Sequence, residues 1–573
     1  MTQSVLKRNG NIINKKYLEY FWPTVLTAMA NNIAILVDSV LVGQLVGSTS
    51  MAAINLLSPV TQLYFSMTIL FGLGSSTIIS YAKGKNDKEV ADKTFTVVFI
   101  SLFVLSALLM AVQFLFMGNI ASILTPIPEL KEQLMLYYMP FIIGTPFYML
   151  LSIVVHCIRS DGRPKFASNL IIISNAINLT MDIVLMGVLK TGIIGSSIAT
   201  VIGNVVAIVI MLSHFRNPKN TLHFDFSILK NLRQFFISFA SMFTTGLSGA
   251  LGTLLVVVRM YFLNTLIQNA AGKHGMVAMS VISMSQIFMS AFVTGASQTM
   301  IPIVSVLMGE KDFRGIQYAL KKAVIILLIA SSALIVIIEA VPQYVAQFFG
   351  NMTGDEMLVI VPALRLSSLS FCGLALSFLF MYYYMATKRK GFSVTISVLN
   401  GIAIIIPCAY LMDLIWGING IWLSMVAAQY GTLLVLAVMV FVTVKCSKGR
   451  YKNFYLLDES SKEELLSFSV NSEISQDLIA NYLSENLSIP DDTKVKIILA
   501  TTYLLAQINS LGAKKEKPVD CDIRIRFEDN NYILFIRSNG NELDGDKLIL
   551  ENNICKSLDC YCVLGMNQIK VII

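Results

Sequence analysis

Apolar runs separated by short polar loops fill the chain up to about residue 445. Twelve of these runs, at about 20 residues or more, are long enough to cross roughly 30 Å of hydrocarbon as a helix. They cover residues 18–46, 52–81, 95–118, 134–157, 166–188, 193–213, 235–266, 276–305, 321–348, 357–386, 392–414 and 419–444. We therefore predict an all-α polytopic membrane protein with twelve transmembrane helices.

The pattern changes after the last run, where charges are spread among short apolar stretches. Residues 463–512 are predicted to be helical. Strict alternation at 521–527 and 532–537 predicts a β-hairpin, and 568–573 a last strand. Residues 451–573 are therefore expected to form a small cytoplasmic α+β domain.

A constant shift of 225 positions relates the two halves of the membrane part. The matched pairs are Gly47 and Gly272, Met51 and Met276, Ala53 and Ala278, Ser58 and Ser283, Gly84 and Gly309, Asp87 and Asp312, Asn175 and Asn400, Gly192 and Gly417, and Gly195 and Gly420. A period this long indicates a duplicated half. We predict an amino-terminal lobe at 1–226 and a carboxy-terminal lobe at 227–450, with six helices each. The shift pairs Asp38 with Leu263, so the two lobes share a pattern of helices but differ in their ionisable residues.

Basic residues are confined to alternate loops, and the loops of the other side hold only Lys131, Lys190 and Lys273. Because Lys and Arg mark cytoplasmic loops, both termini are predicted to be cytoplasmic, in a cell membrane. Six is an even number, so the two lobes insert the same way up. Their pseudo-symmetry axis should run along the membrane normal, with a cavity between them.

Composition agrees with a protein that lives in the lipid bilayer. The chain is 55% hydrophobic and 14% charged, with a mean hydropathy of +0.69, whereas soluble domains are about 45–50% apolar and about 25% charged. The net charge of +8 does not indicate nucleic acid, because the Lys and Arg lie in loops between the runs. The eight Cys are scattered and form no CxxC pair, which indicates free thiols. We expect neither enzymatic activity nor a cofactor.

Ionisable residues inside the predicted spans are candidates for function because each is costly there. Asn178 and Asp182 are four residues apart, on one face of the fifth span. Asp38 lies nine residues before one outer-loop glycine, Asp182 lies ten before another, and Thr200 lies eight after the latter. At 1.5 Å per residue, Asp38, Asp182 and Thr200 lie roughly 12–15 Å below the outer surface. Their equal depth allows one shared, oxygen-lined site.

Two carboxylates, an amide oxygen and a hydroxyl are suitable ligands for Na⁺, and two neighbouring carboxylates also suit a proton. The alternative is that each Asp only caps or pairs within the bundle. His156 is a second candidate, for which an interfacial position is favoured over a place in a substrate cavity. Arg259 lies near mid-bilayer on the seventh span and needs a partner or a water-filled cavity.

Three segments resemble the multidrug and toxic compound extrusion (MATE) transporters: residues 37–53, 159–165 with the following Asn178-x-x-x-Asp182, and 192–200. The resemblance covers about residues 17–445. It implies two six-helix lobes that expel organic cations by antiport with Na⁺ or H⁺. It also places the cation site on Asp38, Asn178, Asp182 and Thr200.

The chain departs from this family at two positions. Val155-His156-Cys157 stands where many members have an Asn, and Arg259 stands on the helix where other members rely on a carboxylate. A fixed positive charge in the cavity would disfavour a purely cationic substrate.

The tail, over roughly 463–573, resembles a GHKL-type (histidine-kinase-like) ATPase domain of the anti-sigma-factor kind. Gln507 stands at the place of the family's Mg²⁺-binding Asn, and Ser538-x-Gly540 at the place of its adenine-binding Asp-x-Gly. Both changes remove ligands for a nucleotide. We expect a domain that binds a cytoplasmic regulator, with nucleotide binding doubtful and no ATP hydrolysis.

The sequence thus predicts a secondary efflux transporter of organic, cationic compounds that works by alternating access. Two alternatives remain open. One is a flippase of lipid-linked saccharides, in which Arg259 contacts a pyrophosphate. The other is a membrane sensor that signals through residues 451–573.

Overall fold

The chain folds into two compact units. A computed structural model describes residues 6–217, 220–348, 354–451, 453–458, 464–471, 474–512, 519–543, 548, 550–551 and 553–573. One unit contains residues 19–309 and 320–439, and the other contains residues 1–18, 310–319 and 440–573. The domain boundaries expected after residues 226 and 450 stay predictions.

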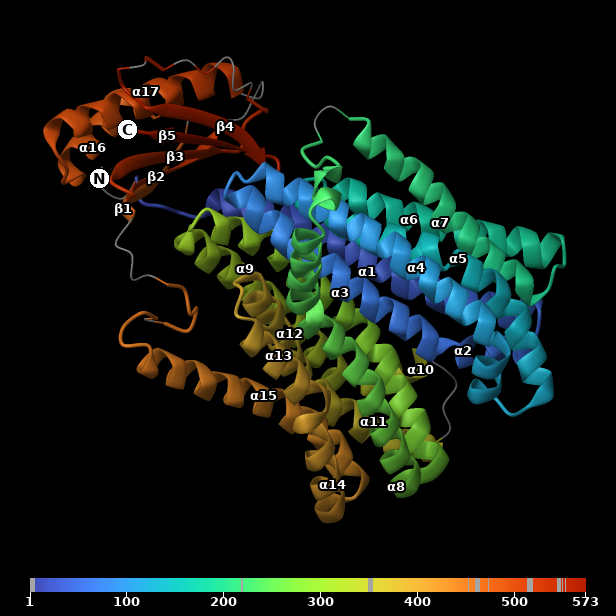
Figure 1. The fold of residues 1–573 in the computed structure, drawn as a ribbon. Helices are drawn as coiled ribbons and strands as arrows, with labels where there is room; N and C mark the ends of the chain where they lie inside the picture. The colour runs from blue at the N-terminus through green and yellow to red at the C-terminus, as the bar shows by residue number, and fades with distance from the viewer. Residues whose placement is uncertain are drawn as a thin grey trace. The chain divides into compact units, whose positions relative to one another are not determined.

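Helices make up the membrane part (Figure 1). They are α1 (Asn11–Leu45), α2 (Ser48–Leu56), α3 (Ser58–Gly84), α4 (Lys88–Leu124), α5 (Pro128–Ser160), α6 (Pro164–Asp182), the π-helix η1 (Ile183–Val188), α7 (Ile193–Phe215), the 3-10 helix η2 (Phe226–Lys230), α8 (Leu232–Gly309), α9 (Phe313–Ala340), α10 (Pro342–Phe348), α11 (Gly354–Ser368), α12 (Phe371–Ala386), α13 (Lys390–Val398), the π-helix η3 (Leu399–Ala403), α14 (Ile405–Trp416) and α15 (Ile418–Cys446).

The helices account for the predicted membrane crossings. Ten of the helices in the described part of the chain are long and apolar enough to span a membrane. One of them, α8, has 78 residues and turns at Gly272, whose φ of 52° is left-handed, so it supplies two spans. α11 and α12, bent by 42° at their junction, together make another. The twelve predicted crossings are reached only by counting α8 twice and this pair once.

The two lobes pack closely where α3 meets α8. A Cβ atom on Gly84 would lie 2.1 Å from the carbonyl oxygen of Val306, and one on Gly309 would lie 2.3 Å from that of Tyr81. A Cβ on Gly246 would lie 1.8 Å from another α3 carbonyl. Gly84 and Gly309 are partners in the 225-residue repeat and end α3 and α8, beside the basic loops. The lobes are therefore in backbone contact at their basic ends.

The repeat extends to the loops that follow these helices. The carboxylate of Asp87 accepts a hydrogen bond of 3.1 Å from the backbone of Val90, at the start of α4. The carboxylate of its partner Asp312 accepts one of 2.9 Å from the backbone of Gly315, at the start of α9. Both residues thus cap a helix amino terminus.

The tail contains a five-stranded antiparallel sheet and two helices. The strands β1 (Glu464–Asn471), β2 (Asp520–Glu528), β3 (Asn531–Ser538), β4 (Ser557–Val563) and β5 (Met566–Ile572) pair in the order β1-β2-β3-β5-β4. The helices α16 (Gln476–Asn486) and α17 (Asp491–Gly512) lie over the sheet (Figure 1).

The sequence predicted part of this domain. The hairpin is confirmed: β2 and β3 pair through a turn at Asp529 and Asn530, both with positive φ. The last strand is also confirmed. The prediction that 463–512 is helical throughout is wrong at its start, because β1 is a strand there. β4 was not predicted.

The two faces of the sheet differ in chemistry. Alternate residues such as Ile523, Ile536 and Ile569 pack with α16 and α17 in one apolar core. The intervening residues on the opposite face include Arg524 and Arg537, and both are buried. A polar face that is buried must have partners.

Those partners come from residues 6–18 and 310–319, which belong to the same unit. Arg8 lies 2.6 Å from Asp312, and Arg537 lies 3.0 Å from it. Glu310 pairs with Arg537 and accepts a hydrogen bond of 2.9 Å from Gln568. We call these five side chains the buried ion cluster. Burial alone would raise the pKa of Asp312, but the surrounding guanidinium groups hold it well below its usual range.

Candidate functional site

The two membrane carboxylates meet in the amino-terminal lobe. Asp38 lies on α1 and Asp182 is the last residue of α6, and their carboxyl groups are close enough to interact directly. Ser196 of α7 donates a hydrogen bond of 3.0 Å to Asp38 Oδ1. Helices α1, α6 and α7 therefore converge on one acidic site.

Asp182 is fully buried, and neither of its carboxylate oxygens accepts a hydrogen bond from any described residue. Directly after it the chain enters the π-helix η1, a type of segment that is frequent at functional sites. A buried carboxylate without a donor or counter-charge is costly. A proton or a small cation bound between Asp182 and Asp38 would remove that cost.

The other two predicted site residues bond to each other beside this pair. Asn178 Nδ2 donates a hydrogen bond of 3.1 Å to Thr200 Oγ1. Thr200 Oγ1 in turn donates to the backbone oxygen of Ser196, at 3.2 Å. Since Ser196 also bonds to Asp38, the four predicted residues form one continuous polar site.

Sequence reasoning missed two members of this site. Ser196 precedes Thr200 by four residues and so shares its helix face, a signal that could have been used. Tyr137 of α5 is buried, bonds to Ser196 and lies in the field of Asp38 and Asp182. Nothing in the sequence around Tyr137 indicated this position.

His156 lies in the interior of the amino-terminal lobe. It is buried near the end of α5, and a Cβ atom on Gly72 of α3 would lie 2.6 Å from its ring. The side chain therefore packs between helices, and the interfacial depth expected for His156 stays a prediction. His156 does not line the cavity around Arg259 either.

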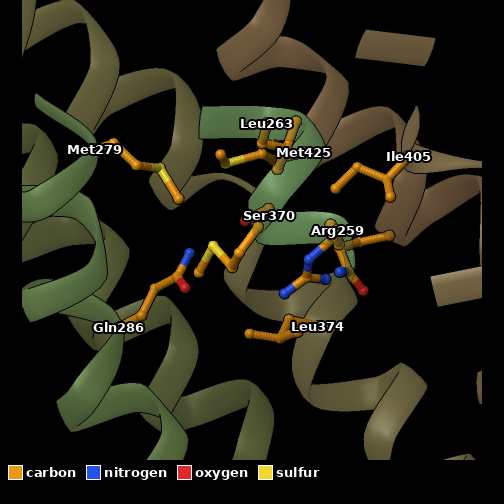
Figure 2. Close-up of a pocket in the computed structure, with 10 residues that line it drawn as sticks. Arg259, Leu263, Met279, Gln286, Ser370, Leu374, Ile405 and Met425 are labelled. Carbon is orange, nitrogen blue, oxygen red and sulfur yellow. The ribbon is translucent and has the colours of Figure 1, made fainter. Parts of the chain in front are cut away.

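Arg259 lines a cavity in the carboxy-terminal lobe (Figure 2). It lies on the first arm of α8, and its Nη1 donates a hydrogen bond of 3.4 Å to the backbone oxygen of Asn400, in the π-helix η3. The cavity holds about 30 Å³, more than the roughly 10–15 Å³ that one water molecule needs. Gln286, Ser370 and Gln429 supply its other polar side chains. The basic and the acidic residues thus occupy different lobes.

The three positions that the GHKL resemblance singled out lie on two elements of the tail and in the loop that follows one of them. Gln507 is on α17, and Ser538 ends β3, two residues before Gly540. Ser538 is buried, and its hydroxyl accepts a hydrogen bond of 3.3 Å from Asn567 Nδ2. Asn567 also donates to the backbone oxygen of Asn541, at 2.7 Å. Ser538 therefore takes part in hydrogen bonds within the tail.

Comparison with known proteins points to one class. The family model MatE matches residues 23–184. The multidrug export protein MepA of Staphylococcus haemolyticus is 21% identical over 419 residues, covering 73% of this chain and 91% of that protein. A solved structure of a multidrug resistance MATE family transporter in an outward-facing conformation has a TM-score of 0.71 at 18% identity, covering 76% of this chain and 97% of that one. The Vibrio cholerae MATE transporter VcmN in its bent form has a TM-score of 0.70 at 19% identity, covering 76% and 99%.

Two repeated lobes with a polar site inside the bundle are an arrangement known from membrane transporters. The family model matches the amino-terminal lobe, and the membrane part of the chain has the fold of the solved MATE transporters.

Proposed function

We propose that this protein exports small organic compounds across a cell membrane by antiport with Na⁺ or H⁺. The observation that carries the proposal is the meeting of Asp38 with a buried Asp182 that lacks any hydrogen-bond donor among the described residues. The naming of similar proteins as multidrug exporters supports the substrate class.

The acid pair provides the coupling. One positive charge, from H⁺ or Na⁺, relieves the repulsion between two close carboxylates. Asn178, Thr200 and Ser196 add neutral oxygens to the ligand set for Na⁺. Binding of the ion from outside would favour the inward-facing state and release the substrate outward, because the ion and the substrate compete for the same negative field.

The orientation of the protein in the membrane follows from the distribution of Lys and Arg among its loops. The loops beside Gly84 and Gly309, where the lobes touch, are rich in Lys and Arg. We place these loops and both termini in the cytoplasm. Contact between the lobes at that side corresponds to an arrangement closed toward the cytoplasm.

The test is ion-driven export in sealed proteoliposomes. Asp38→Asn and Asp182→Asn should each lower gradient-driven efflux of a cationic dye to background, because an amide neither binds a proton nor attracts Na⁺. Glu129→Gln, which removes an exposed carboxylate of the same lobe, should leave the rate unchanged. Export at the normal rate by both Asp variants would refute the coupling. Imposing Na⁺ and pH gradients separately identifies the ion.

The flippase alternative depends on Arg259. Arg259→Ala should change the preference among organic compounds. Loss of transport of an anionic saccharide lipid, with dye export intact, would instead favour the flippase.

For the tail we propose a regulatory domain that hydrolyses no ATP. Ser538 and Gln507 replace the nucleotide ligands of the GHKL family, and Asn567 occupies the hydrogen-bonding capacity of Ser538. The full-length protein should therefore release no phosphate from ATP above a protein-free control. Titration with a fluorescent ATP analogue tests whether a nucleotide binds without being hydrolysed. Measurable turnover of ATP would contradict the proposal. A variant that no longer exports but still signals through the tail would favour the sensor alternative.

A further inference from the structure

Arg259 has an unusual environment for a charge in a membrane bundle. None of the described carboxylates pairs with it, and the hydrogen bond to the backbone of Asn400 satisfies one of its five donors. A guanidinium in such a place needs water or an anion. The remaining donors are therefore available to a ligand in the cavity.

The cavity wall suits an anionic group. Gln429 is 4% exposed and its side-chain Oε1 has no hydrogen-bond partner among the described residues, so its amide is unsatisfied as it stands. Rotation of that amide by half a turn would present two N–H donors instead. Gln286 and the hydroxyl of Ser370 line the same cavity (Figure 2). Arg259 and the two glutamine side chains can together donate to the oxygens of one carboxylate, while the hydroxyl of Ser370 already donates to the backbone oxygen of Ser367, at 2.6 Å.

The cavity also occupies the place that corresponds to the acid site of the other lobe. The 225-residue shift takes Asp38 to Leu263 and Thr200 to Met425. Both Leu263 and Met425 line the Arg259 cavity. The two lobes therefore hold sites at equivalent positions but with opposite charge.

We propose that the Arg259 cavity binds the carboxylate of the transported compound, so that amphipathic organic acids and zwitterions are preferred over purely cationic compounds. The inference rests on the proposed export function and narrows its substrate class. The volume of about 30 Å³ fits one such group. The rest of the molecule would lie outside, where Met279 and Leu374 offer an apolar border.

The experiment is equilibrium binding to the purified full-length protein, without any ion gradient. The probes are two rhodamine dyes that differ in one group, a free carboxylate in one and its methyl ester in the other. The wild-type protein should bind the acid more tightly than the ester by about tenfold or more, because a charge-assisted hydrogen bond has that effect. R259Q should bind both dyes alike, at the affinity that the wild type shows for the ester.

Two further variants serve as controls. Arg365→Gln removes the same charge from the same lobe, at a residue 3.6 Å from Glu339, and should keep the preference for the acid. R259K keeps the positive charge and should still bind the acid more tightly than the ester, by a smaller factor. If R259Q binds neither dye, the affinities of R259K for the two dyes test the proposal instead. If R259K binds both dyes equally, the positive charge at this position does not select the carboxylate, and the proposal is overturned.

Absence of a preference in the wild type, or its persistence in R259Q, also overturns the proposal. These results differ from a failure of the proposed function. If ion coupling at the acid pair is wrong, D38N and D182N export normally, while the binding preference without a gradient is unaffected. If the anion site is wrong, R259Q binds like the wild type while D38N and D182N still lose export.

Discussion

Asp161 shows how one residue ties together three elements at the basic end of the amino-terminal lobe. It follows α5, pairs with Lys83 of α3 and accepts a hydrogen bond of 2.5 Å from the hydroxyl of Thr221. His214 Nε2 of α7 lies 3.0 Å from its other oxygen. Burial would raise the pKa of Asp161, but Lys83 and the hydrogen bonds lower it to about 2.

This pKa predicts a pH dependence of stability. A carboxyl whose pKa falls from its ordinary 3.8 to about 2 on folding stabilises the protein above pH 4. That contribution, about 2 kcal/mol, is lost as the pH falls from about 4 to about 2. Asp161→Asn should therefore melt at a lower temperature than the wild type at pH 7, with a gap that narrows as the pH approaches 3.

The measurement is the thermal unfolding midpoint in detergent at several pH values. Glu129→Gln, at an exposed position, should keep a constant difference from the wild type. A gap between Asp161→Asn and the wild type that stays constant down to pH 3 would show that Asp161 does not carry this stabilisation.

At the same scale, the sequence located the acids but not all their neighbours. Asp38 and Asp182 could be found because a charge in an apolar run is conspicuous and depth can be counted from the loops. Tyr137 could not, because an aromatic residue in a membrane span has many ordinary roles. The lack of a described carboxylate paired with Arg259 is likewise a property of packing, which the sequence does not state.

The sheet of the tail is the element in which sequence and structure differ most. Alternation in β2 and β3 predicted the hairpin correctly, because period-two patterning is a strong local signal. The same alternation suggests that the polar face is solvated, yet Arg524 and Arg537 are 1% exposed. Their partner Glu310 lies more than 200 positions away, so no local pattern could reveal it. β1 and β4 were missed although they are as long as β3 and β5.

The buried ion cluster predicts a strong effect of a small change. Asp312→Asn leaves Arg8 and Arg537 buried with one anion fewer, and breaking a buried pair costs about 3–5 kcal/mol. The variant should lower the stability of residues 440–573, seen as faster proteolysis of the tail in the intact protein under native conditions.

The repeat supplies the matched control. Asp87 caps α4 as Asp312 caps α9, and Asn caps a helix about as well as Asp does. Asp87→Asn should therefore change stability by well under 1 kcal/mol. Equal effects of the two substitutions would mean that the cluster contributes nothing beyond the cap.

At the scale of the whole molecule, the duplication explains both the likeness and the difference of the lobes. Gly84 and Gly309, which are partners in the repeat, lie against each other where the lobes touch. Both lobes therefore keep the same residue type at this contact. The partner positions Asp38 and Leu263 differ: Asp38 belongs to the acid site, whereas Leu263 forms an apolar part of the cavity wall beside Arg259. Hydropathy and the 225-residue shift were enough to predict this architecture, because membrane spans are long and nearly unbroken. Interruptions of the α-helices such as η1 and η3 could not be predicted in this way, because π-helical turns have no distinct composition.

The buried ion cluster also sets an order of events during synthesis. Arg8 leaves the ribosome before Asp312, and Arg537 and Gln568 follow more than 200 residues after Asp312. The charges made earlier must therefore stay hydrated while the later helices enter the membrane. Only after Gln568 has been made can these distant segments leave water together.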